Sequence, residues 1–457
     1  MRNFGVMRYF SSILLVIATL IVGCKPNNST IETSSEARVN SFSFYSDTLN
    51  PGLKEATYKI EHRSDTGLIY NEDSLRFGTR LDRVVPYVTH KKTPGSATYV
   101  LPDTTIVSTG VDTMDLSRDP IYLHVIASDM KNERWYRIKL NVHQVDPNLY
   151  VWEQLTANIF PKQNCETKAF WIDNKLVLYV NNGLSTQVYH SLNGKNWQVL
   201  SNNISELPTP CKVRDIIQHH DTLYYIEDNT LYRSHDLLHW SSMDNSNALF
   251  TLENMLLSYD GYAWCVVQDK ASEALMLATL QADSIVPLQY IEGLEDGKLP
   301  TNFPISDFAA LEFASSSERP RAMIVGGRSI NGEAVNSRWN IEYSAIDEAY
   351  RLKDFSITQP SFHSLTGASI IQYDDQLLMF GGIDNDLTWR SDMLYSKDEG
   401  MNWYIPDSTH NQLPSTYQTR QYQSVILDDT QHIYIIGGQS STESFSDVYR
   451  GKRNLMK

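Results

Sequence analysis

The sequence has few cysteines and too little positive charge for several classes of protein. Only four cysteines occur in 457 residues, and none lies in a CxxC or Cys/His spacing typical of a zinc site. Acidic residues outnumber basic ones by 54 to 39, which gives a formal net charge of −15. Such a chain repels the phosphate backbone, and it has no basic stripe, which argues against a nucleic-acid partner. We expect neither a metal nor any other cofactor.

The N-terminal apolar run is too short to span a bilayer. Residues 13–22 (ILLVIATLIV) follow two arginines and precede Gly23 and Cys24, a pattern typical of a secretory signal peptide. A small residue before a cysteine resembles the bacterial lipobox, in which the cysteine sulfur receives a diacylglycerol. Residues 24–37 are polar and without period, as in a flexible tether. We therefore expect residues 1–23 to be removed and lipidated Cys24 to anchor the protein in the cell envelope, at the outer membrane.

Residues 38–147 carry strand patterns and no convincing amphipathic helix. Apolar and polar residues alternate in 39–45 (VNSFSFY) and 56–62 (ATYKIEH), the period of a half-buried strand. Segment 121–144 alternates on both sides of a turn, which predicts a β-hairpin. A unit of this size and pattern predicts a β-sandwich. The hairpin is similar to the last two strands of cadherin-like domains in bacterial surface proteins, which implies a role as a spacer.

The rest of the chain is built from repeats. Segments 189–197 (YHSLNGKNW), 232–240 (YRSHDLLHW) and 395–403 (YSKDEGMNW) each have a Tyr, a nearby Ser, a polar turn and a closing Trp. Apolar strands that end in paired glycines recur as AMIVGG, LLMFGG and IYIIGG. Six copies of such a four-strand unit predict an all-β fold in which a six-bladed β-propeller occupies residues 148–457. Residues 150–155 (YVWEQL) resemble a fourth strand, and we expect them to close the ring.

These motifs resemble known propellers. The Gly-Gly strands resemble those of kelch propellers, and residues 396–403 are similar to the Asp-box of sialidase-type propellers. The Asp-box resemblance implies a structural turn, in which Asp398 accepts backbone N–H groups, Gly400 takes a positive φ and Trp403 is buried. The whole layout resembles an uncharacterised, domain-of-unknown-function family of Bacteroidetes lipoproteins with an Ig-like or cadherin-like sandwich and a degenerate kelch-like propeller. That resemblance implies a location and a fold but no reaction.

Three cysteines remain after Cys24. Cys165 and Cys211 each precede an expected inner strand of successive repeats, so in an exported protein they either pair or stay as buried thiols. Cys265, within YAWCVV, is expected in the core.

The loops at one end of the ring are the expected ligand site. Those that enter the inner strands include 207–215, 299–307 and 413–422, and those that follow the Gly-Gly pairs include 326–339 and 381–390. The candidate ligand-binding residues on these loops are Arg214, Asp307, Arg338, Trp339, Trp389, Arg390 and Arg420. Tryptophan beside arginine or aspartate suits stacking on sugars or a protein hot spot. Packing between blades is the equal alternative for both tryptophans.

Two classes of function remain open. We expect a non-enzymatic, lipid-anchored protein whose propeller binds a protein or glycan partner, and we assign no catalytic residue. The alternative is a carbohydrate-active enzyme, sialidase- or mutarotase-like, with its site at the propeller centre. A structural subunit of a nutrient-uptake complex is a third reading. Carboxylates that converge with arginine on the channel would favour the enzyme, and a wide mouth with scattered polar residues would favour binding.

The lipobox hypothesis predicts the behaviour of a Cys24→Ala variant. Without the thiol no diacylglycerol can be attached, so we expect the variant to be soluble or to keep its signal segment. Membrane fractionation with immunodetection measures this outcome. Normal membrane association of the variant would contradict the lipoprotein assignment.

Overall fold

The computed structural model describes residues 33–454 except 51, 148, 162–163, 246–248, 282–283, 318, 357–364, 385–386 and 406–412. Cys24 and the predicted signal segment lie outside the described residues. The chain divides into two compact units, Met1–Asp146 and Pro147–Lys457. In the described part no helix is long and apolar enough to cross a membrane. Its secondary structure is β-strand apart from one short 3₁₀ helix, Val213–Asp215.

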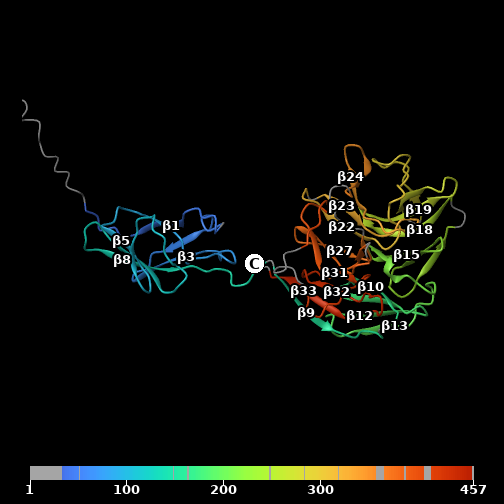
Figure 1. Ribbon diagram of the computed structural model, residues 1–457, viewed down its shortest axis with the longest axis horizontal. Helices are drawn as coiled ribbons and strands as arrows, with labels where there is room; N and C mark the ends of the chain where they lie inside the picture. The colour runs from blue at the N-terminus through green and yellow to red at the C-terminus, as the bar shows by residue number, and fades with distance from the viewer. Residues whose placement is uncertain are drawn as a thin grey trace, which may run out of the picture. The chain divides into compact units, whose positions relative to one another are not determined.

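The first unit is a β-sandwich, as the alternating sequence predicted. Its strands are β1 (Val39–Phe44), β2 (Tyr58–Glu61), β3 (Thr66–Asn71), β4 (Pro86–His90), β5 (Ser96–Val100), β6 (Thr105–Val107), β7 (Ile121–Ile126) and β8 (Glu133–Lys139). One sheet pairs β1 with β4, and the other has the order β2-β3-β8-β7-β5-β6 (Figure 1). The predicted hairpin is β7-β8, and its alternate residues Leu123 and Tyr136 are buried in the core that the two sheets share.

The second unit contains six sheets of three or four strands, numbered here as blades 1 to 6, so the predicted six-bladed propeller is confirmed. Blade 1 has β10 (Glu166–Ile172), β11 (Lys175–Asn181), β12 (Thr186–Ser191) and β13 (Gln198–Ser201). Blade 2 has β14 (Ile217–His219), β15 (Thr222–Glu227), β16 (Thr230–Ser234) and β17 (Ser241–Asp244). Blade 3 has β18 (Phe250–Tyr259), β19 (Tyr262–Asp269), β20 (Leu275–Gln281) and β21 (Ser284–Pro287).

The later blades carry the paired glycines. Blade 4 has β22 (Ala309–Ala314), β23 (Pro320–Val325), β24 (Arg338–Ser344) and β25 (Ala349–Asp354). Blade 5 has β27 (Ser369–Tyr373), β28 (Gln376–Phe380) and β30 (Met393–Ser396), beside a short pair of β26 (Leu365–Thr366) and β29 (Ile383–Asp384). Blade 6 has β31 (Ser424–Leu427), β32 (Ile433–Ile436) and β33 (Val448–Arg453), and its fourth strand is β9 (Tyr150–Thr156).

Strand β9 closes the ring. It pairs antiparallel with β33, from Tyr150 opposite Arg453 to Thr156 opposite Val448. On the inner side, β10 contacts β31 and the 3₁₀ helix, β14 contacts β18, β18 contacts β22, β22 contacts β27, and β27 contacts β31. The first strands of the blades therefore surround a common centre (Figure 1). The start and the end of this unit therefore share one sheet, in which β9 covers the outer edge of β33.

The paired glycines let each later blade approach the next one closely. Gly326 and Gly327 have φ values of 63° and 92°. A Cβ on Gly326 would lie 2.0 Å from the carbonyl oxygen of Leu365, and the N–H of Gly327 donates to that same oxygen at 2.8 Å. Equivalent glycine pairs meet Arg420 in blade 6 and Thr167 in blade 1. At each Gly-Gly pair two blades are therefore so close that any side chain would obstruct the contact between them.

The Asp-box-like turn after β30 is built as the resemblance implies. Asp398 accepts a hydrogen bond from the backbone N–H of Asn402 at 2.9 Å, and Ser396 Oγ accepts one from the N–H of Gly400 at 2.9 Å. Gly400 has a φ of 82°. Trp403 is buried in the core between blades 4 and 5. The side chains of Ser396 and Asp398 therefore stabilise the turn, and the side chain of Trp403 packs in the core.

The cysteines of the described chain are thiols. Cys165, Cys211 and Cys265 are all buried, and no disulfide joins any two of them. Burial raises the pKa of Cys211 to about 12, which disfavours the thiolate. The disulfide alternative for Cys165 and Cys211 is not what the structure shows.

We predict that Gly326→Ala destabilises the propeller more than Gly332→Ala. Both glycines have positive φ, so both variants carry left-handed strain of roughly 1–2 kcal/mol. Only at Gly326 would the new Cβ also collide with backbone, since Gly332 has nothing within 4 Å. Thermal unfolding at one scan rate measures the difference. We expect Tm to fall by a few degrees for Gly332→Ala and at least twice as far for Gly326→Ala, and equal shifts would contradict the proposed contact.

Candidate functional site

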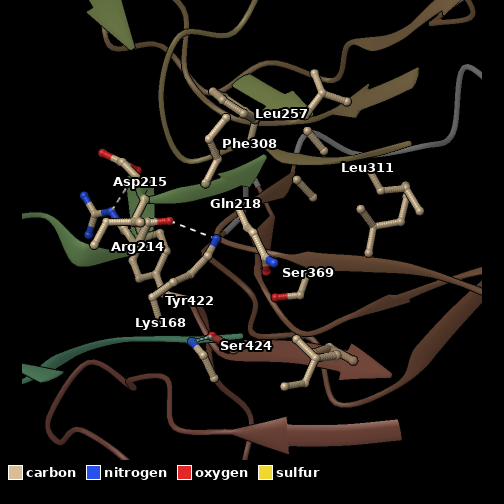
Figure 2. Close-up of a pocket in the computed structure, with 18 of the residues that line it drawn as sticks. Lys168, Arg214, Asp215, Gln218, Leu257, Phe308, Leu311, Ser369, Tyr422 and Ser424 are labelled. Atoms are coloured by element: carbon tan, nitrogen blue, oxygen red, sulfur yellow. Dashed lines mark hydrogen bonds and ion pairs between the residues drawn. The ribbon is translucent and has the colours of Figure 1, made fainter. Parts of the chain in front are cut away.

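A cavity of about 370 Å³ lies at the centre of the propeller. Every blade contributes residues to its wall, from β10, β18, β22, β27 and β31 and from the 3₁₀ helix that runs into β14 (Figure 2). Charged groups gather where the chain enters these inner strands. Farther along, the wall includes the apolar side chains of Leu257, Phe308 and Leu311 and the hydroxyls of Ser369 and Ser424. The cavity is therefore a channel with one strongly charged end.

Three residues in the left-handed region shape this end. Asp307 and Tyr422 have φ values of 55° and 56°, and Gly367 occupies the equivalent place in blade 5 with a φ of 70°. The N–H of Tyr422 donates to the carbonyl of Gly367 at 2.7 Å, and the N–H of Gly367 donates to that of Asp307 at 2.9 Å. Positive φ is costly for residues other than glycine and persists where the surroundings enforce it. The backbone chain across blades 4, 5 and 6 holds Asp307 and Tyr422 at the cavity.

Arg214 is the centre of the charged end. Its guanidinium lies 2.9 Å from Glu166 Oε1, 3.9 Å from Asp215 Oδ1 and 3.4 Å from Asp307 Oδ1. It also stacks on the ring of Tyr422, with its central carbon 4.3 Å from the ring centroid. These partners come from blades 1, 2, 4 and 6, so the arginine joins four blades at one point. Figure 2 shows Arg214 beside Asp215 and Tyr422.

Two further cations complete the cluster. Arg328 Nε donates to Asp307 Oδ2 at 3.1 Å, on the side away from Arg214. Lys168 extends from β10 and donates from Nζ to the backbone carbonyl of Arg214 at 3.1 Å (Figure 2). We call six residues the charged cluster: Glu166, Lys168, Arg214, Asp215, Asp307 and Arg328.

Burial shifts the proton affinities of several members. It raises the pKa of Asp215 to about 6, because desolvation disfavours the carboxylate and the charges of Asp307 and Glu166 add to the effect, against Arg214. Burial also raises the pKa of Glu166, although Arg214 opposes it. The pKa of Lys168 is lowered by burial and partly restored by Asp215. The cluster thus holds carboxyl groups that titrate closer to neutrality than free ones.

The structure brings together two of the seven candidate residues. Arg214 and Asp307 were predicted from loops 207–215 and 299–307, and both line the cavity. They form an ion pair although they belong to blades 2 and 4.

Arg338 and Trp339 lie in the interior instead of in an exposed loop. Arg338 begins β24 and is 0% exposed, and its guanidinium donates to the carbonyls of Met401 and Ser356. Trp339 is 5% exposed and packs against Phe303. Both side chains therefore fix blade 4 and its neighbour, and the packing alternative holds for Trp339.

Arg420 is also structural. It is 0% exposed and forms a bidentate pair with Asp447 of the same blade. Its guanidinium lies against the rings of Tyr417, Phe445 and Tyr449 and donates to a backbone carbonyl of the Gly-Gly loop. A buried charge of this kind is stable only when fully paired, so it is not available to a ligand.

Trp389 and Arg390 lie in the loop after the glycines of blade 5, and neither lines the cavity. Trp389 is half-buried and forms a backbone bridge with Ile383. Arg390 lies 3.5 Å from Asp392. The structure separates this pair from Arg214 and Asp307.

Sequence reasoning missed Glu166, Lys168, Asp215, Arg328 and Tyr422 as site residues, although Asp215 ends loop 207–215, which the sequence did single out. Arg328 and Tyr422 stand in loops that the sequence did single out, one after a Gly-Gly pair and one before an inner strand. A comparison of the three inner-strand entries would have placed Tyr422 and Gly367 level with Asp307. Glu166 and Lys168 alternate within an ordinary strand, and no local pattern marks them.

Comparison with known proteins agrees with the fold. A family model described as the DUF6242 beta propeller domain matches residues 146–457, and the DUF6242 N-terminal domain, of unknown function, matches residues 27–140. No curated protein matches. Among solved structures, one described as "Structure of YjhT" is 12% identical and has a TM-score of 0.45, covering 64% of this chain and 95% of its own. None of these descriptions states a reaction.

The pKa of Asp215 predicts a distinct dependence of stability on pH. Because the folded protein holds this proton up to about pH 6, against an ordinary value of 3.8, Asp215 favours the folded state most below pH 4 and loses that contribution as pH rises through 6. We expect the free energy of unfolding of wild type, relative to Asp215→Asn, to fall by up to about 3 kcal/mol between pH 4 and 7. Urea titrations at several pH values measure this.

Asp236 provides a control of opposite sign. Hydrogen bonds from His239 lower the pKa of Asp236, so wild type should gain stability relative to Asp236→Asn as pH rises through its acidic range. Difference curves of the same sign for the two variants would contradict the burial of Asp215 at the channel.

Proposed function

The chain belongs to the DUF6242 family, and we propose that this member is a lipid-anchored envelope protein whose propeller binds a glycan at the charged end of its central channel. The observation that carries the proposal is the cavity itself, in which Arg214, the ring of Tyr422 and several carboxylates converge from different blades. Polar groups that converge in a formed cavity are the usual mark of a ligand site.

The size and lining of the cavity favour a glycan over a protein segment. A volume of about 370 Å³ is at the small end of the range for small-molecule sites, roughly 300–1,000 Å³. It admits a sugar or the end of a glycan, whereas a protein partner needs a buried area of roughly 800 Å² on each side. Apolar side chains such as Phe308 and Leu257 can contact the C–H faces of a sugar, and hydroxyl and carboxylate groups can bind its hydroxyls.

The anchor and the sandwich supply the setting. The lipobox-like sequence at Cys24 supports attachment to the envelope, and residues 24–37 are polar as in a tether. In the chain, the sandwich separates the tether from the propeller. It therefore acts as a spacer, and the propeller does the binding.

A carbohydrate-active enzyme is the second candidate, and one observation favours it. Carboxyl groups with raised pKa converge with an arginine on the channel, which is how acid and base catalysts are prepared. However, Glu166, Asp215 and Asp307 all pair with Arg214. Structural ion-pair networks shift pKa values in the same way, so binding is the principal proposal.

A glycan array beside a pull-down from solubilised envelope tests the proposal. We expect array binding by the wild-type chain and at least tenfold weaker binding by Arg214→Gln, because that change removes the group that organises the charged end. The matched control is Arg351→Gln. Arg351 is a partly exposed arginine of β25, paired with Glu292 and outside the cavity lining, and its loss should leave binding unchanged.

Three outcomes of this experiment are informative. A silent array together with a specific protein in the pull-down would overturn the glycan proposal in favour of a protein partner. Equal binding by wild type and Arg214→Gln would move the site away from the channel. Release of product from a bound glycan at pH 5 to 7 would replace the binding proposal with the enzyme.

A further inference from the structure

We infer that the channel selects a neutral, polyhydroxylated ligand and discriminates against sugars that carry a carboxylate or an ammonium group. This inference rests on the proposed function, because it specifies the class of glycan that enters the same cavity. Two features of the cavity support it: the balance of charge in the cluster, and the polar side chains that line the wall beyond the cluster.

The charges of the cluster compensate one another. Its three cationic side chains are Lys168, Arg214 and Arg328, and its three acidic ones are Glu166, Asp215 and Asp307. Lys168 has a lowered pKa and Asp215 a raised one, both because of burial. If a proton passes from the lysine to the aspartate, the sum of charges stays the same. The channel entrance therefore presents no net charge to a ligand.

One more acid lines the cavity, far from the cluster. Glu312 lies near the end of β22, five residues after Asp307 and so roughly 16 Å farther along the chain. Burial raises its pKa. Because of its distance along the strand, Glu312 does not supply the charged end with a counter-charge for a cationic ligand.

A charged ligand would have to break an existing pair. An incoming carboxylate competes with Glu166 and Asp307 for Arg214, and the displaced acid would remain in a site where its partner is lost. An incoming ammonium group competes with Arg214 and Arg328 for Asp307, which is only 9% exposed. Removing one partner of a buried pair is strongly unfavourable, because the other charge is left uncompensated. A neutral ligand leaves every pair intact.

Apart from Glu312, the remaining polar wall is uncharged. Gln218, Ser369 and Ser424 line the cavity beyond the cluster (Figure 2). Ser424 Oγ accepts from the N–H of Ala169 at 2.7 Å and keeps its own hydrogen to donate. In the described chain no group of three or more His, Cys, Asp or Glu side chains has the arrangement of a metal site. Hydroxyl-rich ligands fit this wall better than ions do.

Matched sugars provide the test. The full chain is titrated, by ligand-observed NMR at pH 7, with D-glucose, D-glucuronate and D-glucosamine, and with the same three forms of D-galactose and D-mannose. Each charged sugar differs from its neutral parent at one position: the carboxylate replaces CH₂OH at C6, and the ammonium replaces the hydroxyl at C2. We expect the neutral member of the best-bound series to bind at least tenfold more tightly than either charged member.

Two variants each remove one charge from the cluster and should change which sugar binds most tightly. Glu166→Gln leaves the cluster with one excess positive charge, so glucuronate should gain at least tenfold relative to glucose. Arg328→Gln leaves one excess negative charge, so glucosamine should gain instead. Both substitutions keep the approximate size of the side chain, and thermal unfolding checks that the propeller is intact. Glu292→Gln, which changes a partly exposed acid paired with Arg351 on the outer side of blade 4, should leave all ratios unchanged.

The outcomes separate this inference from the proposed function. If glucuronate or another acidic sugar binds wild type as tightly as its neutral form, and the binding is lost in Arg214→Gln, the channel binds glycans but the selectivity is wrong. Ratios that do not move in either charge variant would also overturn the selectivity. If no sugar of any charge binds while the array is silent, the glycan function itself fails.

Discussion

The pairing of β9 with β33 is the constraint on which the rest of the propeller depends. Backbone hydrogen bonds between Tyr150–Thr156 and Val448–Arg453 join the first and last strands of the unit in one sheet. This pairing joins the two ends of the unit at the outer edge of blade 6, while β10 and β31 meet at the inner side. Tyr150 strengthens the junction, since its hydroxyl accepts a hydrogen bond from Gln376 of blade 5 at 3.2 Å.

The charged end of the channel is a product of that ring. Arg214 of blade 2 meets acids of blades 1 and 4 and an aromatic ring of blade 6, so no single blade could assemble the site. The backbone chain from Tyr422 through Gly367 to Asp307 fixes the position of the side chains across three blades. Such a site is rigid, because each member is held by a strand or by its hydrogen-bonded neighbours. Rigid, pre-paired groups suit selective recognition of a small ligand.

The sequence predicted what is local and repeated, and it failed where several blades meet. Some features depend only on residues that are close together in the sequence, namely the Gly-Gly pairs, the turn at Asp398 and the alternation in β7 and β8. The fold class could be predicted from these features. The neighbouring residues in the sequence do not distinguish Arg338 and Arg420 from Arg214. In the structure, however, Arg338 and Arg420 are buried against carbonyls or rings of distant segments. An arginine beside a glycine-rich loop is needed as often to hold that loop as to bind a ligand. Which role applies depends on the register between blades, and one strand does not contain that information.

The strand that closes the ring is also the strand through which the propeller is pulled. The chain passes from the sandwich directly into β9, where Leu149 already accepts a hydrogen bond from Asn454. Any tension between the sandwich and the propeller is therefore carried first by the ladder between β9 and β33. Mechanical loading and closure of the ring act on the same hydrogen bonds. A force large enough to peel β9 away would expose the outer edge of β33 and separate the two ends of the propeller.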